Sequence, residues 1–221
     1  MNKRFLVLSL IMAAASSAQT LTVNTTLDTI DPSDGVLSLR EAITLSNLQV
    51  GADSITFAVG ADAERIRWGI ETARAARAAG GLQPGMAFGA YVNVVVHDDP
   101  EVGRRLGEGG VSLFARFSAM HGSALGPTTA EEKRVMEGIH DAYDMTRHSR
   151  AGSPQAGVIT SEFASEFGIF GDSRYCLERL QGLVALGLDR LVVVGSSAGA
   201  EPNEAARAEQ RFVEEVLPGL R

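Results

Sequence analysis

The sequence predicts an α/β protein preceded by a short β-rich segment. Two nearly continuous apolar runs, residues 88–96 and 188–194, have the pattern of strands that are buried on both faces of a parallel sheet. Stretches with a helical period of apolar residues flank both runs. Before residue 57 the sequence instead alternates between polar and apolar residues and is rich in β-branched residues. The two patterns meet at residues 57–61.

The composition is that of an ordinary globular protein. The 221 residues are 45% hydrophobic and 21% charged, which suits one domain or two small ones. The net charge of -7 and the lack of a basic patch argue against nucleic-acid binding. The single cysteine, Cys176, excludes an intramolecular disulfide and a thiolate cluster for zinc or iron, so we expect a small buried side chain.

The first 18 residues predict a secretory signal peptide. Lys3 and Arg4 precede an apolar run over residues 5–15, and small residues at 16–18 suit cleavage before Gln19. A run of ~11 apolar residues is too short to cross a bilayer, which needs about 20. We therefore expect export to the periplasm or the extracellular space, and no stable membrane span.

The segment after the signal peptide is predicted to be rich in β-structure. Residues 20–23 alternate between threonine and apolar side chains, and residues 31–35 carry Pro and Gly in a turn-forming order. Ser38 and Glu41 have the spacing of a capping box at the start of a short helix. Residues 51–57 have the pattern of a second alternating strand.

This segment resembles the CSLREA-type domain, which stands at the N-terminus of secreted right-handed parallel β-helix proteins. The resemblance implies a structural cap without chemistry. Leu37 stands where the family has Cys, and no repeat that could form stacked coils follows Phe57. The matching residues are Asp28, Asp34, Gly35, residues 38–43, Asn47, Gly51, Asp53, Ile55 and Phe57.

The segment after residue 57 alternates helices and buried strands. Ile66, Ile70 and Ala73 share one face of its first helix, which Gly80 ends. Later helices carry capping signals, such as the capping box of Thr129 and Glu132. The remaining expected elements are a strand over 88–96, helices from 98, over 129–147 and over 175–186 with a cap at 172–173, a loop at 152–157, a strand over 188–194 and a helix over 203–217.

The same segment resembles the C-terminal part of the luciferase-like, flavin- or deazaflavin-dependent oxidoreductases, nearest to the methylenetetrahydromethanopterin reductase branch. The resemblance implies a (β/α)8 barrel, of which this segment would hold the C-terminal strands, a helical insertion and the closing helix. It also implies FMN or a deazaflavin, coenzyme F-420, as the cofactor, with hydride transfer or monooxygenation as the reaction. The matching residues are 61–66, 88–93, 97–100, 167–172 and 187–195.

The predicted organisation has three parts. They are a signal peptide (1–18), a CSLREA-like β-rich segment (19–57) and the C-terminal portion of a luciferase-like barrel (58–221). The signal peptide predicts export, whereas the oxidoreductase resemblance implies a cytoplasmic protein. We follow the signal.

Gly195, Ser196 and Ser197 are the candidate cofactor-binding residues, because they follow the second buried strand. Backbone N–H groups at the carboxyl end of a barrel strand can hold a phosphate, although Pro202 delays the next helix. The run to Gly199 also matches the G-x-S-x-G pattern, which would make Ser197 a hydrolase nucleophile. No Asp or His follows Ser197, so the acid and base of that arrangement are missing and a glycine-bearing loop is favoured.

Other titratable residues have simpler interpretations. His97 follows the first buried strand and could donate a proton there, but Asp98 and Asp99 suit the N-terminus of a helix, and we prefer that interpretation. Glu162 and Glu166 stand four apart, and a solvated carboxylate pair is favoured over an acid–base pair. No catalytic residue is assigned and no metal site is predicted, since three histidines lack a metal-binding spacing: His121, His140 and His148.

These observations support two hypotheses of function. The first is a truncated or fused luciferase-like oxidoreductase that is inactive alone, because most of the family's active site has no counterpart, and that self-associates through unpaired barrel strands. The alternative is a secreted structural or binding protein with a CSLREA-type cap and no catalysis, or a fusion artefact without a function of its own. Whether the chain is an enzyme stays open at this point.

Overall fold

The computed structural model describes most of the chain after residue 53. The described residues are 54–57, 60–81, 86–119, 124 and 126–220, together with 30, 31, 33 and 44. The predicted signal peptide (1–18) and nearly all of the CSLREA-like segment lie outside the described residues, so both stay predictions. The chain divides into two compact units, Met1–Asp53 and Ser54–Arg221, and the sheet lies in the second.

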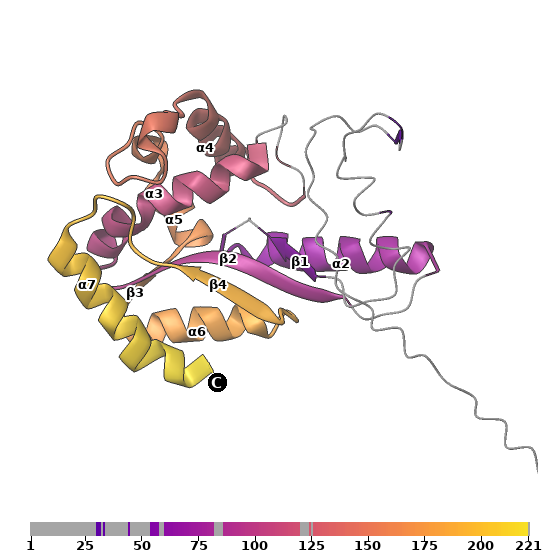
Figure 1. Cartoon of the computed structure of the whole chain (residues 1–221). Coiled ribbons are helices and arrows are strands. Elements are labelled where there is room, and N and C mark those ends of the chain that lie inside the picture. The colour runs from indigo at the N-terminus through magenta and orange to yellow at the C-terminus, as the bar shows by residue number, and fades with distance from the viewer. Residues whose placement is uncertain are drawn as a thin grey trace, which may run out of the picture. The chain divides into compact units, whose positions relative to one another are not determined.

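Parallel strands alternate with helices through the described part of the second unit (Figure 1). The strands are β1 (Ser54–Phe57), β2 (Ala87–Val96), β3 (Ile169–Gly171) and β4 (Arg190–Val194). The α-helices are α2 (Ala63–Ala79), α3 (Pro100–Ala119), α4 (Ala130–Asp141), α5 (Ser161–Phe167), α6 (Ser173–Val184) and α7 (Pro202–Arg211). Shorter helical turns are η1 (Met145–Arg147), η2 (Ala156–Val158), η3 (Phe212–Val216) and η4 (Leu217–Leu220). No helix within the described ranges is both long and apolar enough to cross a membrane.

β2 is the central strand of the sheet. β1 pairs with the first part of β2, and β3 pairs with its last part along the same edge. β4 pairs with the opposite edge of β2, from Gly89 to Asn93. All three pairings are parallel, so the carboxyl ends of β2, β3 and β4 point to the same edge of the sheet.

β1 belongs to the second unit, although its sequence also suits the segment before it. Ser54 lies opposite Ala87 and Phe57 lies opposite Ala90 in the parallel pairing with β2. The predicted division between residues 57 and 58 therefore falls at the end of a strand of the second unit. An alternating sequence pattern is compatible with either unit. The pairing with β2 is what assigns residues 54–57 to the second unit.

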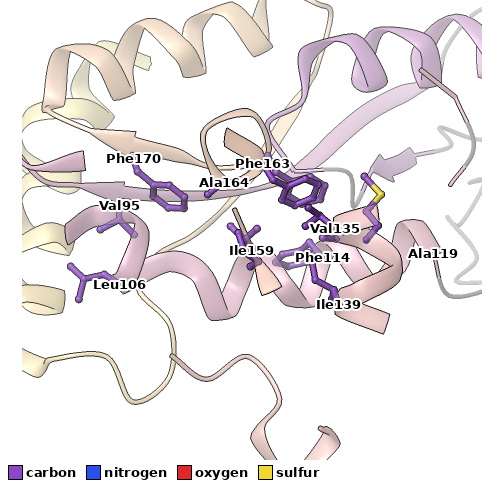
Figure 2. Packing of buried hydrophobic residues seen from close by; sticks show 14 of the residues in the cluster. Val95, Leu106, Phe114, Ala119, Val135, Ile139, Ile159, Phe163, Ala164 and Phe170 are labelled. Carbon is purple, nitrogen blue, oxygen red and sulfur yellow. The ribbon is translucent and has the colours of Figure 1, made fainter. Parts of the chain in front are cut away.

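The apolar side chains of β2 divide between two helical layers. On one face, alternate residues of β2 form a cluster with α2 and α6. On the other face, Tyr91 and Val95 pack against α3. Side chains of α4 and α5 extend this second cluster (Figure 2). The first cluster includes Phe88, Ala90, Val92, Val94, Val96, Ile66, Ile70, Cys176, Leu180 and Leu183.

α3 lies directly on the second face of the sheet. The ring of Phe114 stacks on that of Tyr91 with centroids 5.1 Å apart. Gly110 permits the close approach, because a Cβ there would lie 2.3 Å from Asn93 Nδ2. Since α2 and α6 cover the opposite face, a closed barrel would turn the face under α3 to its interior. We call it the inner face.

The predicted α/β class is confirmed. Parallel strands with intervening helices are consistent with part of a (β/α)8 barrel, and β2 is buried on both faces as its apolar run predicts. The described sheet has helices on both faces, in three layers, with α3 covering the inner face.

Most helix starts agree with their sequence signals. The capping box of Thr129 and Glu132 is formed, and Asp172 caps α6 by accepting the N–H of Tyr175. α4 ends at Asp141 instead of near residue 147, because Asp144 starts a separate turn, η1, by accepting the N–H of Thr146. The sequence does not predict β3, since three residues are too short for a strand pattern.

Candidate functional site

The carboxyl ends of the parallel strands are where open α/β sheets bind ligands. His97 follows β2, Asp172 follows β3 and Gly195 follows β4. Two hollows border this edge in the described structure, and α7 contributes side chains to both. We call them the apolar hollow and the charged hollow.

The apolar hollow has a volume of about 640 Å³ and lies between the carboxyl end of β4 and α7. Most of its lining side chains are apolar. Among the described residues that line it, Glu209 carries the one charge. The lining residues are Val94, Val193, Gly195, Ser196, Ser197, Pro202, Ala205, Ala206, Ala208, Glu209, Phe212 and Val213.

Ser197 is held against α3. Its backbone N–H donates to Leu106 O at 2.7 Å, and its Oγ accepts the N–H groups of Gly109 at 2.9 Å and Gly110 at 3.3 Å. The residue is buried, with 8% exposure. The next residue, Ala198, accepts the N–H of Ala151 at 3.1 Å. The bonds of Ser197 fix the loop after β4 onto α3, and the bond of Ala198 joins the loop to the turn after η1.

The hydrogen bonds of Ser197 give it a structural role. A hydrolase nucleophile would need its hydroxyl next to a base. Within the described part of the chain, no histidine bonds to Ser197 Oγ, whose partners are the two glycine N–H groups. The glycine-bearing loop, favoured from the sequence, agrees with this geometry.

All three predicted cofactor-binding residues line the apolar hollow, but the hollow does not fit a phosphate. A phosphate site needs free N–H donors and favours positive charge. The N–H of Ser197 is already bonded to Leu106, and the lining described above contains no Lys or Arg. The carboxylate of Glu209 adds negative charge instead. Gly195 and Ser196 alone remain as candidate contacts.

The charged hollow, of about 520 Å³, lies beside His97. In the tautomer in which His97 Nδ1 accepts the N–H of Asp99 at 2.9 Å, Nε2 carries the proton and faces Glu204 Oε2 at 3.4 Å. Asp98 Oδ1 lies 2.9 Å from Arg211 Nη1. These two contacts join the turn after β2 to α7.

Asp99 caps α3, as the sequence predicts. Its Oδ1 accepts the N–H of Glu101 at 2.9 Å and that of Val102 at 3.4 Å. Asp98 does not share this role, because its carboxylate pairs with Arg211 on α7. The capping interpretation is therefore confirmed for Asp99 and incomplete for its neighbour.

The charged side chains of this second hollow are paired with one another. Arg207 pairs with Glu204, and Arg211 Nε lies 3.3 Å from Glu215 Oε1 in addition to its contact with Asp98. The cluster therefore offers a ligand no charge that lacks a partner. The residues that the structure describes also contain no group of three or more His, Cys, Asp or Glu side chains that could hold a metal ion.

The other titratable candidates are solvated or inert. Glu162 and Glu166 are exposed on α5, which matches the favoured interpretation as a solvated pair. His140 is exposed, and His148 Nδ1 lies 2.7 Å from Tyr143 Oη, while His121 lies outside the described residues. Burial raises the pKa of the Cys176 thiol to about 12, so this side chain stays protonated and packs as an apolar residue.

The contribution of α7 is the part of the site that the sequence does not reveal. Glu204 and Arg211 stand seven residues apart, which places them on one helix face. That spacing signals a charged stripe. It does not say that the stripe meets His97 and Asp98, more than 100 residues earlier in the chain.

Comparisons with known proteins give a weak structural similarity. No protein-family model matches the sequence, and a search of curated proteins finds no match. The fold is similar to the coenzyme F-420-dependent tetrahydromethanopterin reductase from Methanopyrus kandleri, with 14% sequence identity and a TM-score of 0.49. The similarity covers 76% of this chain and 46% of that one, so the chain spans less than half of the reductase. A similarity of this size does not assign a family or an activity.

Proposed function

We propose that this chain is a relative of the luciferase-like, flavin- or deazaflavin-dependent oxidoreductases that neither binds such a cofactor nor transfers hydride as a single chain. The residue pattern of 58–221 and the parallel sheet support the relationship. The signal-peptide pattern of residues 1–18 supports export as part of the same proposal.

The observation that carries this proposal is the docking of the loop after β4. In barrel enzymes, phosphate groups bind at loops that follow the last strands. Here Ser197 donates its N–H to Leu106 and uses its hydroxyl to accept from Gly109 and Gly110. A phosphate would have to displace α3 from the loop before it could use the Ser197 N–H.

The position of α3 also argues against a cofactor on the inner face. Phe114 stacks on Tyr91, and Asn93 is fully buried beside Gly110. A flat isoalloxazine or deazaflavin ring over these strand residues would need the volume that α3 fills. The apolar hollow remains outside this face, with the carboxylate of Glu209 in its wall.

Fluorescence titration of FMN and of coenzyme F-420 with the full chain tests the proposal. We expect no quenching even at millimolar protein, because the N–H of Ser197 and the inner face are already occupied. Quenching with a micromolar dissociation constant would contradict the proposal.

The Glu209→Gln variant separates the charge of the hollow from the docking of the loop. We expect this variant to bind no better than the wild type, because the bonds between Ser197 and α3 are unchanged. Micromolar binding by Glu209→Gln alone would place the obstacle at the carboxylate and contradict the role given to the loop.

A further inference from the structure

The apolar hollow lies between two walls that are each held in place. One wall is formed by the carboxyl ends of β2 and β4, where Val94 and Val193 face the side of the sheet opposite to α3. The other wall is α7, which is joined to the turn after β2 by the contacts of Glu204 and Arg211. The hollow is therefore separate from the inner face, and a ligand enters it without displacing α3.

Small residues leave the volume of this hollow open. Alanine occupies three of the α7 positions that line it, 205, 206 and 208. Gly195 lines the opposite wall, and a Cβ added there would meet no atom within 4 Å. The resulting volume of about 640 Å³ is typical of sites for small molecules, which are mostly apolar and carry a few polar groups.

The polar side chains that line the hollow differ in what they already contact. Ser197 is bonded to α3 through both its N–H and its hydroxyl. Ser196 forms no hydrogen bond, and Glu209 no ion pair or side-chain hydrogen bond, with any residue that the structure describes. By contrast, Arg207 and Arg211 on the same helix are paired with carboxylates. The hollow therefore presents a hydroxyl and a carboxylate that are open to a ligand.

We propose that the apolar hollow binds a small amphipathic amine, that is, a primary ammonium group on an alkyl or aryl body. An ammonium group has three N–H donors and no acceptor. The carboxylate of Glu209 and the oxygen atoms of Ser196 are acceptors for such a group, while side chains such as Val193 and Phe212 cover the apolar body. This inference does not depend on the proposal about flavin or deazaflavin.

The charge of Glu209 selects a cation over other ligands of the same shape. Lys and Arg are absent from the described lining, so a carboxylate or phosphate ligand would meet negative charge alone. Glu209 is exposed, and water and salt screen its ion pair, so we expect the amine to bind about threefold more tightly than a neutral analogue. Burial of the apolar body contributes equally to both ligands.

Three probes that share one alkyl chain test the proposal: octylamine, octan-1-ol and octanoate. Each is titrated into the ¹⁵N-labelled full chain at neutral pH, and the amide shifts give both the affinity and the place of binding. We expect octylamine to bind about threefold more tightly than octan-1-ol and octanoate to bind most weakly. The largest shifts should include Gly195 and Ser196. Octylamine that binds no more tightly than octan-1-ol, or that shifts other regions of the chain instead, would overturn the proposal.

Two variants separate the charge of the hollow from its volume. Glu209→Gln should bind octylamine and octan-1-ol equally, whereas Glu162→Gln, which removes an exposed carboxylate on α5, is the control and should keep the preference for the amine. Gly195→Leu fills the hollow and should weaken the binding of both probes by about tenfold, because the apolar body is no longer covered. Circular dichroism checks that each variant is folded. A preference that survives in Glu209→Gln, or unchanged binding to folded Gly195→Leu, would contradict the proposal.

Discussion

Asn93 is a residue at which the packing of the described structure is unfavourable. It is fully buried on the inner face of β2, and neither its Nδ2 nor its Oδ1 has a hydrogen-bond partner among the residues that the structure describes. Leaving buried polar groups without partners costs about 1–3 kcal/mol. The apolar neighbours in the run 92–96 predict the strand, but they do not show that this amide meets the backbone of α3 near Gly110.

Replacing this amide by an apolar side chain should stabilise the fold. We expect Asn93→Val to raise the free energy of unfolding by about 1–2 kcal/mol, because valine removes both unpaired groups and is no longer than asparagine. Urea denaturation measures the change. Asn93→Asp is the control, since it buries a charge and should destabilise. A loss of stability in the valine variant would mean that the amide has a partner, against the packing described above.

The elements of the second unit are joined by contacts of two kinds. Local signals set the helix starts, as the capping box at Thr129 and the Asp172 cap of α6 show. Contacts between distant elements set the rest, such as the loop after β4, which Ser197 fixes to α3. The sequence predicts the first kind well, because capping residues and apolar periods lie within a few residues. It misses β3 and the partners of α7, which depend on pairing across the fold.

Removing the hydroxyl of Ser197 should loosen α3 from the loop. We expect Ser197→Ala to lower the free energy of unfolding by about 1 kcal/mol, because the N–H groups of Gly109 and Gly110 lose a buried acceptor. Ser196→Ala is the matched control and should change stability by less than about 0.5 kcal/mol, as surface substitutions usually do. Equal stability of both variants in thermal and urea unfolding would contradict the structural role of Ser197.

At the scale of the whole second unit, the inner face of the sheet is filled by its own helix. α3 packs on β2 while α2 and α6 cover the opposite face, so the described unit has a core on each side of the sheet. This explains how a few parallel strands bury both faces without closing a barrel. The sequence predicts the class and the buried strands β2 and β4. It cannot show which face receives α3, because β2 carries buried apolar side chains on both faces.

The contact between Tyr91 and Phe114 tests this placement of α3 most directly. Their ring centroids are 5.1 Å apart in the described structure, where α3 lies on the inner face. In the full chain with selectively labelled aromatic residues, we predict strong nuclear Overhauser effects between the two rings. Their absence, in a sample whose β2 and β4 amides show sheet contacts, would place α3 away from the inner face and contradict the account.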